Sequence, residues 1–308
     1  MENIDFNVEY CNLQLGNLID GGSFGDVYKA HWRTENKAIV VKKIRRVRDN
    51  AGNNEKAILN EIKNNKVLNH PNIITFYVVT KDSENKICML FEFADCGSLY
   101  SFLHESNIKI TLDGKLNWMS QIAKGMEYLH DQKKVHRNLK SKNLLLCNNY
   151  RTVKICDFGT IKELATVNTE GIGTYTYMAP EICYEGGRYT EMCDVFSFGI
   201  VFWEVMSGKK PFYDSQHMLP IALQRKINDE GKRPNIDDID KLKKFEYLYY
   251  TKLLIQKCWD NEPLNRPTMK ILATILGIHD INFINYPNLL FEIDRLRNIC
   301  KEDFKFPN

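Results

Sequence analysis

Residues suited to phosphate and metal chemistry recur along this 308-residue chain. A lysine ammonium can neutralise phosphate oxygens, and carboxylate and amide oxygens are the hard ligands that Mg²⁺ prefers. A glycine-rich stretch precedes them all and could bring backbone N–H groups close to an anion. The side chains that we single out for such chemistry are Lys42, Glu61, Asn138, Lys140, Asn143 and Asp157.

The glycine-rich stretch reads LIDGGSFGDVYKA, residues 18–30. Against the nucleotide-loop pattern Gly-x-Gly-x-x-Gly-x-Val, Gly22 and Gly25 match the second and third glycines, whereas Asp20 stands at the first. A carboxylate near a triphosphate is unfavourable, although the adjacent Gly21 could restore the turn. Because many hairpins carry two glycines, this loop predicts a nucleotide only together with the motifs that follow.

Lys42 ends the strand-like run IVVK, seventeen residues after Gly25. Glu61 lies on the inward stripe of a predicted helix with Ile58 and Ile62, where a lone carboxylate would be costly unless it were paired. We therefore expect Glu61 to pair with Lys42 and to hold it toward the α- and β-phosphates of a nucleotide.

Two hard oxygen donors stand fourteen residues apart, Asn143 in VHRNLKSKNLLL and Asp157 in ICDFGT. An isolated Asp-Phe-Gly is a common turn sequence, but its spacing from Asn143 favours a functional interpretation. Both side chains are predicted ligands of Mg²⁺.

The elements that must position these residues are strands first and helices afterwards. Residues 13–44 favour strands, residues 55–68 favour one helix, and TFYVVTKDSENKICMLFEFA predicts a hairpin with KDSEN as its turn. Beyond DCGSL, apolar residues recur at helical spacing at Met119, Ile122, Met126 and Leu129 and within 193–206 and 251–259.

Taken together, these motifs resemble a eukaryotic protein kinase domain over residues 13 to about 277. The segments VKICDFGTIKE, GTYTYMAPEI and CWDNEPLNRPTM are similar to the tyrosine-kinase-like group, and in particular to the transforming-growth-factor-β-activated kinases of the MAP kinase kinase kinase family. The resemblance implies an α+β, bilobal fold. Its small β-rich lobe would span residues 1–94, its helical lobe 95–280 and a C-terminal tail 281–308.

The resemblance also implies roles for individual residues. Phe91 would be the gatekeeper, Glu92 to Ala94 the hinge that binds adenine, and Val27, Val40 and Leu145 the walls around the ring. Glu181 would pair with Arg266 inside the helical lobe, and Lys140 and Thr174 occupy positions that mark Ser/Thr rather than Tyr kinases. The remaining positions expected near ATP are Ile19, Gly22, Ser23, Phe24, Gly25, Lys42 and Glu61.

Asn138 is the main departure from the family pattern. Kinases carry an aspartate there, which accepts the proton of the substrate hydroxyl. Asparagine keeps one acceptor oxygen but cannot take a proton near pH 7. General-base contributions are roughly 10²–10⁴-fold, so we expect a severe loss of phosphoryl transfer rather than its abolition.

Asn65 is a further departure, because kinases usually carry an apolar residue four positions after the helix glutamate. One interpretation is that an unsatisfied amide biases the helix outward, away from Lys42. The other is that Asn65 reaches solvent or a backbone group and is harmless.

The segment between Asp157 and Glu181 contains five threonines. Most surface threonines have no special role, but a phosphate on Thr166 or Thr169 could pair with Arg137 and order the segment.

Composition excludes several other classes of protein. A net charge of +3 argues against nucleic-acid binding, and the basic cluster between Lys42 and Arg48 is typical of a solvated face. The longest apolar run, FSFGIVFWEVM, is too short for a membrane span and holds a glutamate. Nine cysteines without a CxxC pair, and an acidic N-terminal decapeptide, predict reduced thiols in the cytoplasm.

Three functional hypotheses follow. The first is a signalling protein that binds ATP and Mg²⁺ but transfers phosphate poorly, which would make it a weak kinase or a pseudokinase. The second is an active Ser/Thr kinase that phosphorylates a MAP kinase kinase. The third is an interaction module with an empty cleft, which the retained phosphate and metal residues disfavour. Kinship further implies protein partners in a MAP kinase cascade, including an adaptor on the helical lobe.

Overall fold

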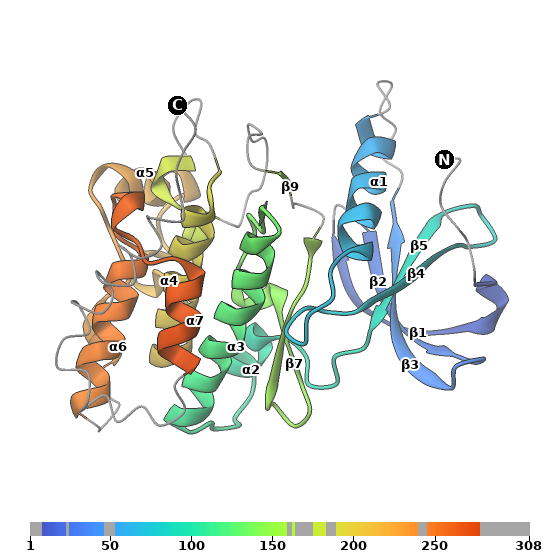
Figure 1. Cartoon of the computed structure of the whole chain (residues 1–308), viewed down its shortest axis with the longest axis horizontal. Coiled ribbons are helices and arrows are strands. Elements are labelled where there is room, and N and C mark those ends of the chain that lie inside the picture. The colour runs from blue at the N-terminus through green and yellow to red at the C-terminus, as the bar shows by residue number, and fades with distance from the viewer. Residues whose placement is uncertain are drawn as a thin grey trace. The chain divides into compact units, whose positions relative to one another are not determined.

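The computed structural model describes residues 8–22, 25–45, 53–158, 162–163, 175–182, 189–239 and 245–277 (Figure 1). Backbone contacts divide the chain into two compact units. The first unit comprises Met1–Asp95 with Cys156–Ile161, and the second comprises Cys96–Ile155 with Lys162–Asn308. The proposed lobe boundaries at 94 and 280 stay predictions, and the tail 281–308 lies outside the described residues.

The first unit contains a five-stranded antiparallel sheet in the order β1-β2-β3-β5-β4. The strands expected within residues 13–44 and the expected hairpin are both present. The bounds are β1 Leu13–Gly22, β2 Gly25–Trp32, β3 Lys37–Ile44, β4 Phe76–Lys81 and β5 Ile87–Glu92.

The two faces of this sheet pack against different apolar groups, because side chains alternate along each strand. Ile39 and Val41 of β3 are fully buried in a cluster with Trp32 and Leu90. Ile44 and Met89 belong to a second cluster that includes residues of helix α1, Asn53–Lys66. Figure 1 shows α1 beside the sheet, so β3 has one face toward α1 and one face toward the other core.

Helix α1 shows where the Asn65 amide finds a partner. The side chain is 3% exposed, and its amide Nδ2 donates to the backbone oxygen of Glu61, one turn earlier on the same helix, at 2.8 Å. The amide therefore has a backbone partner, as the harmless interpretation expected.

The second unit is mainly helical. Its helices are α2 Leu99–Glu105, α3 Leu112–Asp131, α4 Glu191–Ser207, α5 Pro220–Asp229, α6 Phe245–Cys258 and α7 Met269–Gly277. Its short strand pairs are β6 Lys134–Val135 with β9 Lys162–Glu163, and β7 Leu144–Cys147 with β8 Thr152–Ile155. Within the described ranges, the complete 3-10 turns are Tyr10–Asn12 in the first unit and, in the second, Ser141–Asn143, Tyr175–Tyr177, Pro180–Ile182, Tyr213–Ser215, Ile236–Ile239 and Pro263–Asn265.

Helix α4 forms the core of this unit. Fourteen of its residues are buried, so the helix is apolar nearly all round, and it packs against α3 and α6. The expected pair of Glu181 and Arg266 is present nearby, since the guanidinium donates to both carboxylate oxygens at 2.6 and 2.9 Å. Among the described residues, no helix is long and apolar enough to cross a membrane.

Candidate active site

Lys42 and Glu61 form the predicted ion pair within the first unit. Lys42 lies on β3 and Glu61 on α1, and the Lys42 Nζ stands 2.7 Å from the Glu61 Oε1. The two side chains are only 16% and 11% exposed. Burial would lower the pKa of Lys42, but the Glu61 carboxylate and then that of Asp157 outweigh it and raise the pKa above its usual value. Lys42 is therefore a fixed positive charge at physiological pH.

Several residues expected near adenine share the Lys42 face of the sheet. Val27 stands directly opposite Lys42 across the β2–β3 ladder, and Val40 lies two residues before Lys42 and opposite Phe91. Because alternate residues of a strand point to the same face, these side chains lie on one side of the sheet. Their half-buried state leaves that face partly accessible.

The residues expected to form the hinge follow β5. The backbone N–H of Glu92 donates to the Thr75 oxygen at 2.9 Å, and its carboxylate accepts from the Thr75 hydroxyl at 2.8 Å. This side chain therefore fixes the end of β5, and Ala94 lies half-buried two residues later.

The glycine-rich stretch forms the β1–β2 hairpin. Gly22 and Gly25 pair across it, and a Cβ on Gly25 would meet the Lys43 backbone oxygen at 2.4 Å, so only glycine fits there. Asp20 is exposed, and its carboxylate accepts from the Gly21 N–H at 2.9 Å. Ile19 is exposed as well. Ser23 and Phe24 lie outside the described residues.

Asp157 has a left-handed backbone, with φ of 69°. Non-glycine residues adopt this region uncommonly, asparagine and aspartate more readily than most, and such residues are frequent at functional sites. Asp157 belongs to the same unit as Lys42, and its charge contributes to the raised Lys42 pKa.

Asn138 lies in the second unit, in a loop closed by hydrogen bonds. Its backbone N–H donates to the His136 Nδ1 at 3.2 Å, and its backbone oxygen accepts from the Asn143 Nδ2 at 2.8 Å. Asn143 ends the Ser141–Asn143 turn, and Lys140 directly precedes that turn. The loop thus links Asn138 to Asn143, while Leu145 follows on β7.

Asp194 of α4 anchors this loop from below. It is 1% exposed, and its carboxylate accepts from the backbone N–H groups of His136 and Arg137 at 2.8 and 2.9 Å. Burial alone would raise the pKa of Asp194, but the His130 ring at 2.9 Å, then His136 and the Arg137 N–H, hold it below its usual range. A buried negative charge therefore holds the backbone of this loop through hydrogen bonds.

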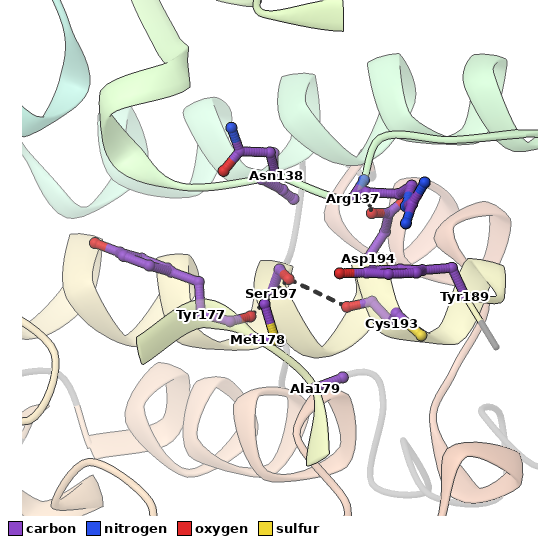
Figure 2. A pocket seen from close by; sticks show the side chains of 10 residues that line it. Arg137, Asn138, Tyr177, Met178, Ala179, Tyr189, Cys193, Asp194 and Ser197 are labelled. Carbon is purple, nitrogen blue, oxygen red and sulfur yellow. Dashed lines mark hydrogen bonds between the residues drawn. The ribbon is translucent and has the colours of Figure 1, made fainter. Parts of the chain in front are cut away.

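A small pocket lies beside the Asp194 anchor (Figure 2). The Arg137 guanidinium lies over the Tyr189 ring at 3.9 Å, and Arg137 itself has a positive φ of 70°. Figure 2 shows the Asn138 amide pointing away from Asp194. The pocket is lined by Arg137, Asn138, Leu139, Tyr177, Met178, Ala179, Tyr189, Cys193, Asp194 and Ser197.

Glu204 forms a second buried anchor that the sequence did not predict. Its carboxylate accepts from the Ser141 and Tyr177 hydroxyls at 2.8 and 2.9 Å and lies 2.8 Å from the His104 Nε2. These partners lie as many as 100 residues away in sequence. The one local signal was a glutamate inside an apolar helical run, since a buried carboxylate needs partners.

The two sets of predicted site residues thus belong to different units. Lys42, Glu61 and Asp157 come together in the first, and Asn138, Lys140 and Asn143 in the second. The threonines Thr166, Thr169 and Thr174 lie outside the described residues.

Comparison with known families gives the class of protein. Residues 13–276 match the model of the family described as protein tyrosine and serine/threonine kinase. The chain therefore belongs to the protein kinase family, and the expected α+β kinase fold is confirmed.

Its similarity to individual proteins is also high. It is 33% identical over 274 residues to mitogen-activated protein kinase kinase kinase 7 of Homo sapiens, and 36% identical over 279 residues to the protein of that name in Drosophila melanogaster. These alignments cover 87% and 89% of this chain but only 42% and 38% of those relatives. A probable serine/threonine-protein kinase of Dictyostelium discoideum is 33% identical over 279 residues, which are 89% of this chain and 28% of that protein. The chain thus spans less than half the length of these curated relatives.

Proposed function

We propose that this chain is a signalling protein that binds ATP and Mg²⁺ and in which Asn138 impairs phosphoryl transfer. The observation that carries the proposal is the closed ion pair between Lys42 and Glu61, in a chain that lacks the carboxylate base. A buried lysine held by a carboxylate is what phosphate binding needs, and a protein that had given up nucleotides would have no use for it.

The residue types present suit ATP and Mg²⁺. Lys42 would hold the α- and β-phosphates, Asp157 and Asn143 would hold Mg²⁺, and Val27, Val40 and Leu145 would contact adenine. When bound, ATP supplies the phosphoryl group and Mg²⁺ neutralises the charge on its phosphates.

In this proposal Asn138 positions the substrate but does not take its proton. Its Oδ1 is buried in this structure, so a substrate hydroxyl would reach it only after a local rearrangement. Once reached, the oxygen could accept a hydrogen bond and orient the hydroxyl, yet an amide is not a base near pH 7. Lys140, two residues later, would offset negative charge beside the reacting group. Phosphoryl transfer would therefore be slow, because the substrate hydroxyl would still be positioned but no general base would accept its proton.

The alternative function is an active Ser/Thr kinase that phosphorylates a MAP kinase kinase. It is favoured by the closed Lys42–Glu61 pair, which active kinases require, and by the names of the relatives. In either case we propose a cytoplasmic protein with partners in a MAP kinase cascade and an adaptor bound to the helical unit.

A thermal-shift titration with Mg-ATP tests the binding half of the proposal. A ligand at a hundred times its Kd stabilises the folded state by about 2.7 kcal/mol, so the melting temperature should rise clearly. The Asp157→Asn variant, which loses a metal ligand, should show a smaller rise. An unchanged melting temperature in the native chain would instead support the interaction module with an empty cleft.

A further inference from the structure

Two lysine side chains from separate segments of the second unit converge on the ring of Tyr100. The Lys142 Nζ lies 4.9 Å from the ring centroid and the Lys210 Nζ lies 5.5 Å from it. Tyr100 is on α2, Lys142 is in the Ser141–Asn143 turn, and Lys210 follows the glycine that ends α4. We call these three residues the Lys142–Lys210 cluster.

Among the described residues, no carboxylate pairs with the charged groups of this cluster. Lys209, next to Lys210, pairs with Asp238 at 2.5 Å. Within the described part of the chain, Lys142 and Lys210 form no such ion pair. Two like charges near one ring repel each other, and an anion between them would remove that repulsion.

The buried Glu204 carboxylate holds this cluster in place through hydrogen bonds. The His104 ring packs edge-on against Tyr100 at 4.8 Å and bonds to Glu204, and Glu204 also accepts from Ser141, the residue before Lys142. The aromatic ring and one lysine backbone are therefore fixed before any ligand arrives. A site ordered in advance loses less entropy on binding.

The cluster also adjoins the loop of Asn138. Lys142 lies between Ser141 and Asn143, and Asn143 donates to the Asn138 backbone oxygen. An anionic group held by Lys142 would thus be bound by the same short loop that carries Asn138. A protein segment offered to Asn138 could place a neighbouring acidic side chain on the lysines.

We propose that the Lys142–Lys210 cluster binds a carboxylate of an acidic segment in the protein substrate. The inference rests on the proposed function for the identity of that segment as a substrate. Lysine ammonium groups act as point charges that suit a carboxylate, and the nearly balanced net charge of +3 gives no general attraction to polyanions. The cluster would therefore select substrates that carry Asp or Glu near the phosphorylated residue.

Fluorescence anisotropy with the full chain tests this inference without any phosphoryl transfer. The probe is a fluorescein-labelled peptide with one serine among aspartates, compared with the same peptide in which asparagines replace the aspartates. We expect the acidic peptide to bind more tightly, and more so at low salt, because exposed charges are screened. The Lys142→Gln/Lys210→Gln variant should bind it about four- to 25-fold more weakly, because each lysine should contribute roughly two- to fivefold and the two factors multiply.

The matched control is Lys124→Gln/Lys270→Gln, which removes the same net charge from exposed positions on α3 and α7. An equal loss of affinity in both double variants would overturn the inference, and so would equal binding of the aspartate and asparagine peptides. Tight binding of a phosphoserine peptide without binding of the aspartate peptide would overturn the assignment to a carboxylate. The anisotropy measurement needs no ATP. A negative result there can therefore be told apart from a negative result in the Mg-ATP titration, which tests the proposed function.

Discussion

The Lys42–Glu61 pair and the loop of Asn138 differ in what each retains. The first is a closed ion pair, with Nζ and Oε1 at 2.7 Å, which we propose to serve phosphate binding. The second has lost the carboxylate at its central position but keeps the buried anchor of Asp194 beneath its backbone. In the second region the departure therefore concerns one side chain on an anchored backbone, so the proposed ATP binding and phosphoryl transfer can be tested separately.

The largest effect should come from restoring the base. We expect Asn138→Asp to raise the rate of phosphoryl transfer roughly 10²–10⁴-fold, because general-base catalysis contributes that much. The measurement is a single-turnover assay at saturating Mg-ATP with a generic protein acceptor. Asn148→Asp, which adds the same charge in the turn after β7, is the matched control.

If the native chain already transfers phosphate as fast as the Asn138→Asp variant, the alternative of an active kinase is correct. If neither chain transfers phosphate at all, the residues around Asn138 are not sufficient for catalysis, and Asn138 is not the main cause of the impairment.

Removal of the Lys42 ammonium tests the proposed phosphate contact of the first region. Lys42→Ala should weaken ATP binding about ten- to a hundredfold, because hydrogen bonds to charged groups are worth about 1.5–3 kcal/mol. Isothermal titration calorimetry measures this directly. Lys43→Ala is the control, since Lys43 is adjacent on β3 but pairs with Asp82. Unchanged affinity in Lys42→Ala would rule out the phosphate contact.

The pH dependence of this contact follows from the sign of the pKa shift. The folded pKa of Lys42 is raised by Glu61 and Asp157 in spite of burial, so the ammonium stays charged well above neutral pH. Its contribution to stability is present below the unfolded pKa and is lost only as the pH rises through the raised one. ATP affinity should therefore not fall between about pH 7 and pH 9 through Lys42, because both values lie below the ordinary lysine pKa.

The buried anchor of Glu204 tests whether the scaffold of the loop is as important as we infer. Glu204→Gln keeps the shape but replaces charge-assisted hydrogen bonds with neutral ones, so we expect a loss of about 1–2 kcal/mol in the free energy of unfolding. Urea denaturation measures it. Glu105→Gln, at an exposed position of α2, should change stability by less than about 0.5 kcal/mol. Equal free energies of unfolding for the two variants would mean that the Glu204 carboxylate does not stabilise the loop.

Much of this architecture was predictable from local patterns. The alternation in KAIVVKKI specified β3, the inward stripe through Ile58 and Ile62 specified α1, and a carboxylate on that stripe required the Lys42 partner. The anchors of Asp194 and Glu204 were not predictable, because their partners are contributed by segments far away in sequence. Spacing reveals contacts within an element, whereas a buried carboxylate reveals only that partners must exist.

The smallest effect should come from Asn65, where the sequence allowed two interpretations. The Asn65 amide donates to the Glu61 backbone oxygen, which an ordinary helical hydrogen bond can still satisfy after the side chain is replaced. Asn65→Leu should therefore change the free energy of unfolding by about 1 kcal/mol or less and leave ATP affinity unchanged. Asn64→Leu, at the adjacent and less buried position, controls for added apolar surface. A higher ATP affinity in Asn65→Leu alone would mean that Asn65 weakens the Lys42–Glu61 pair, and the first region would then be impaired as well as the second.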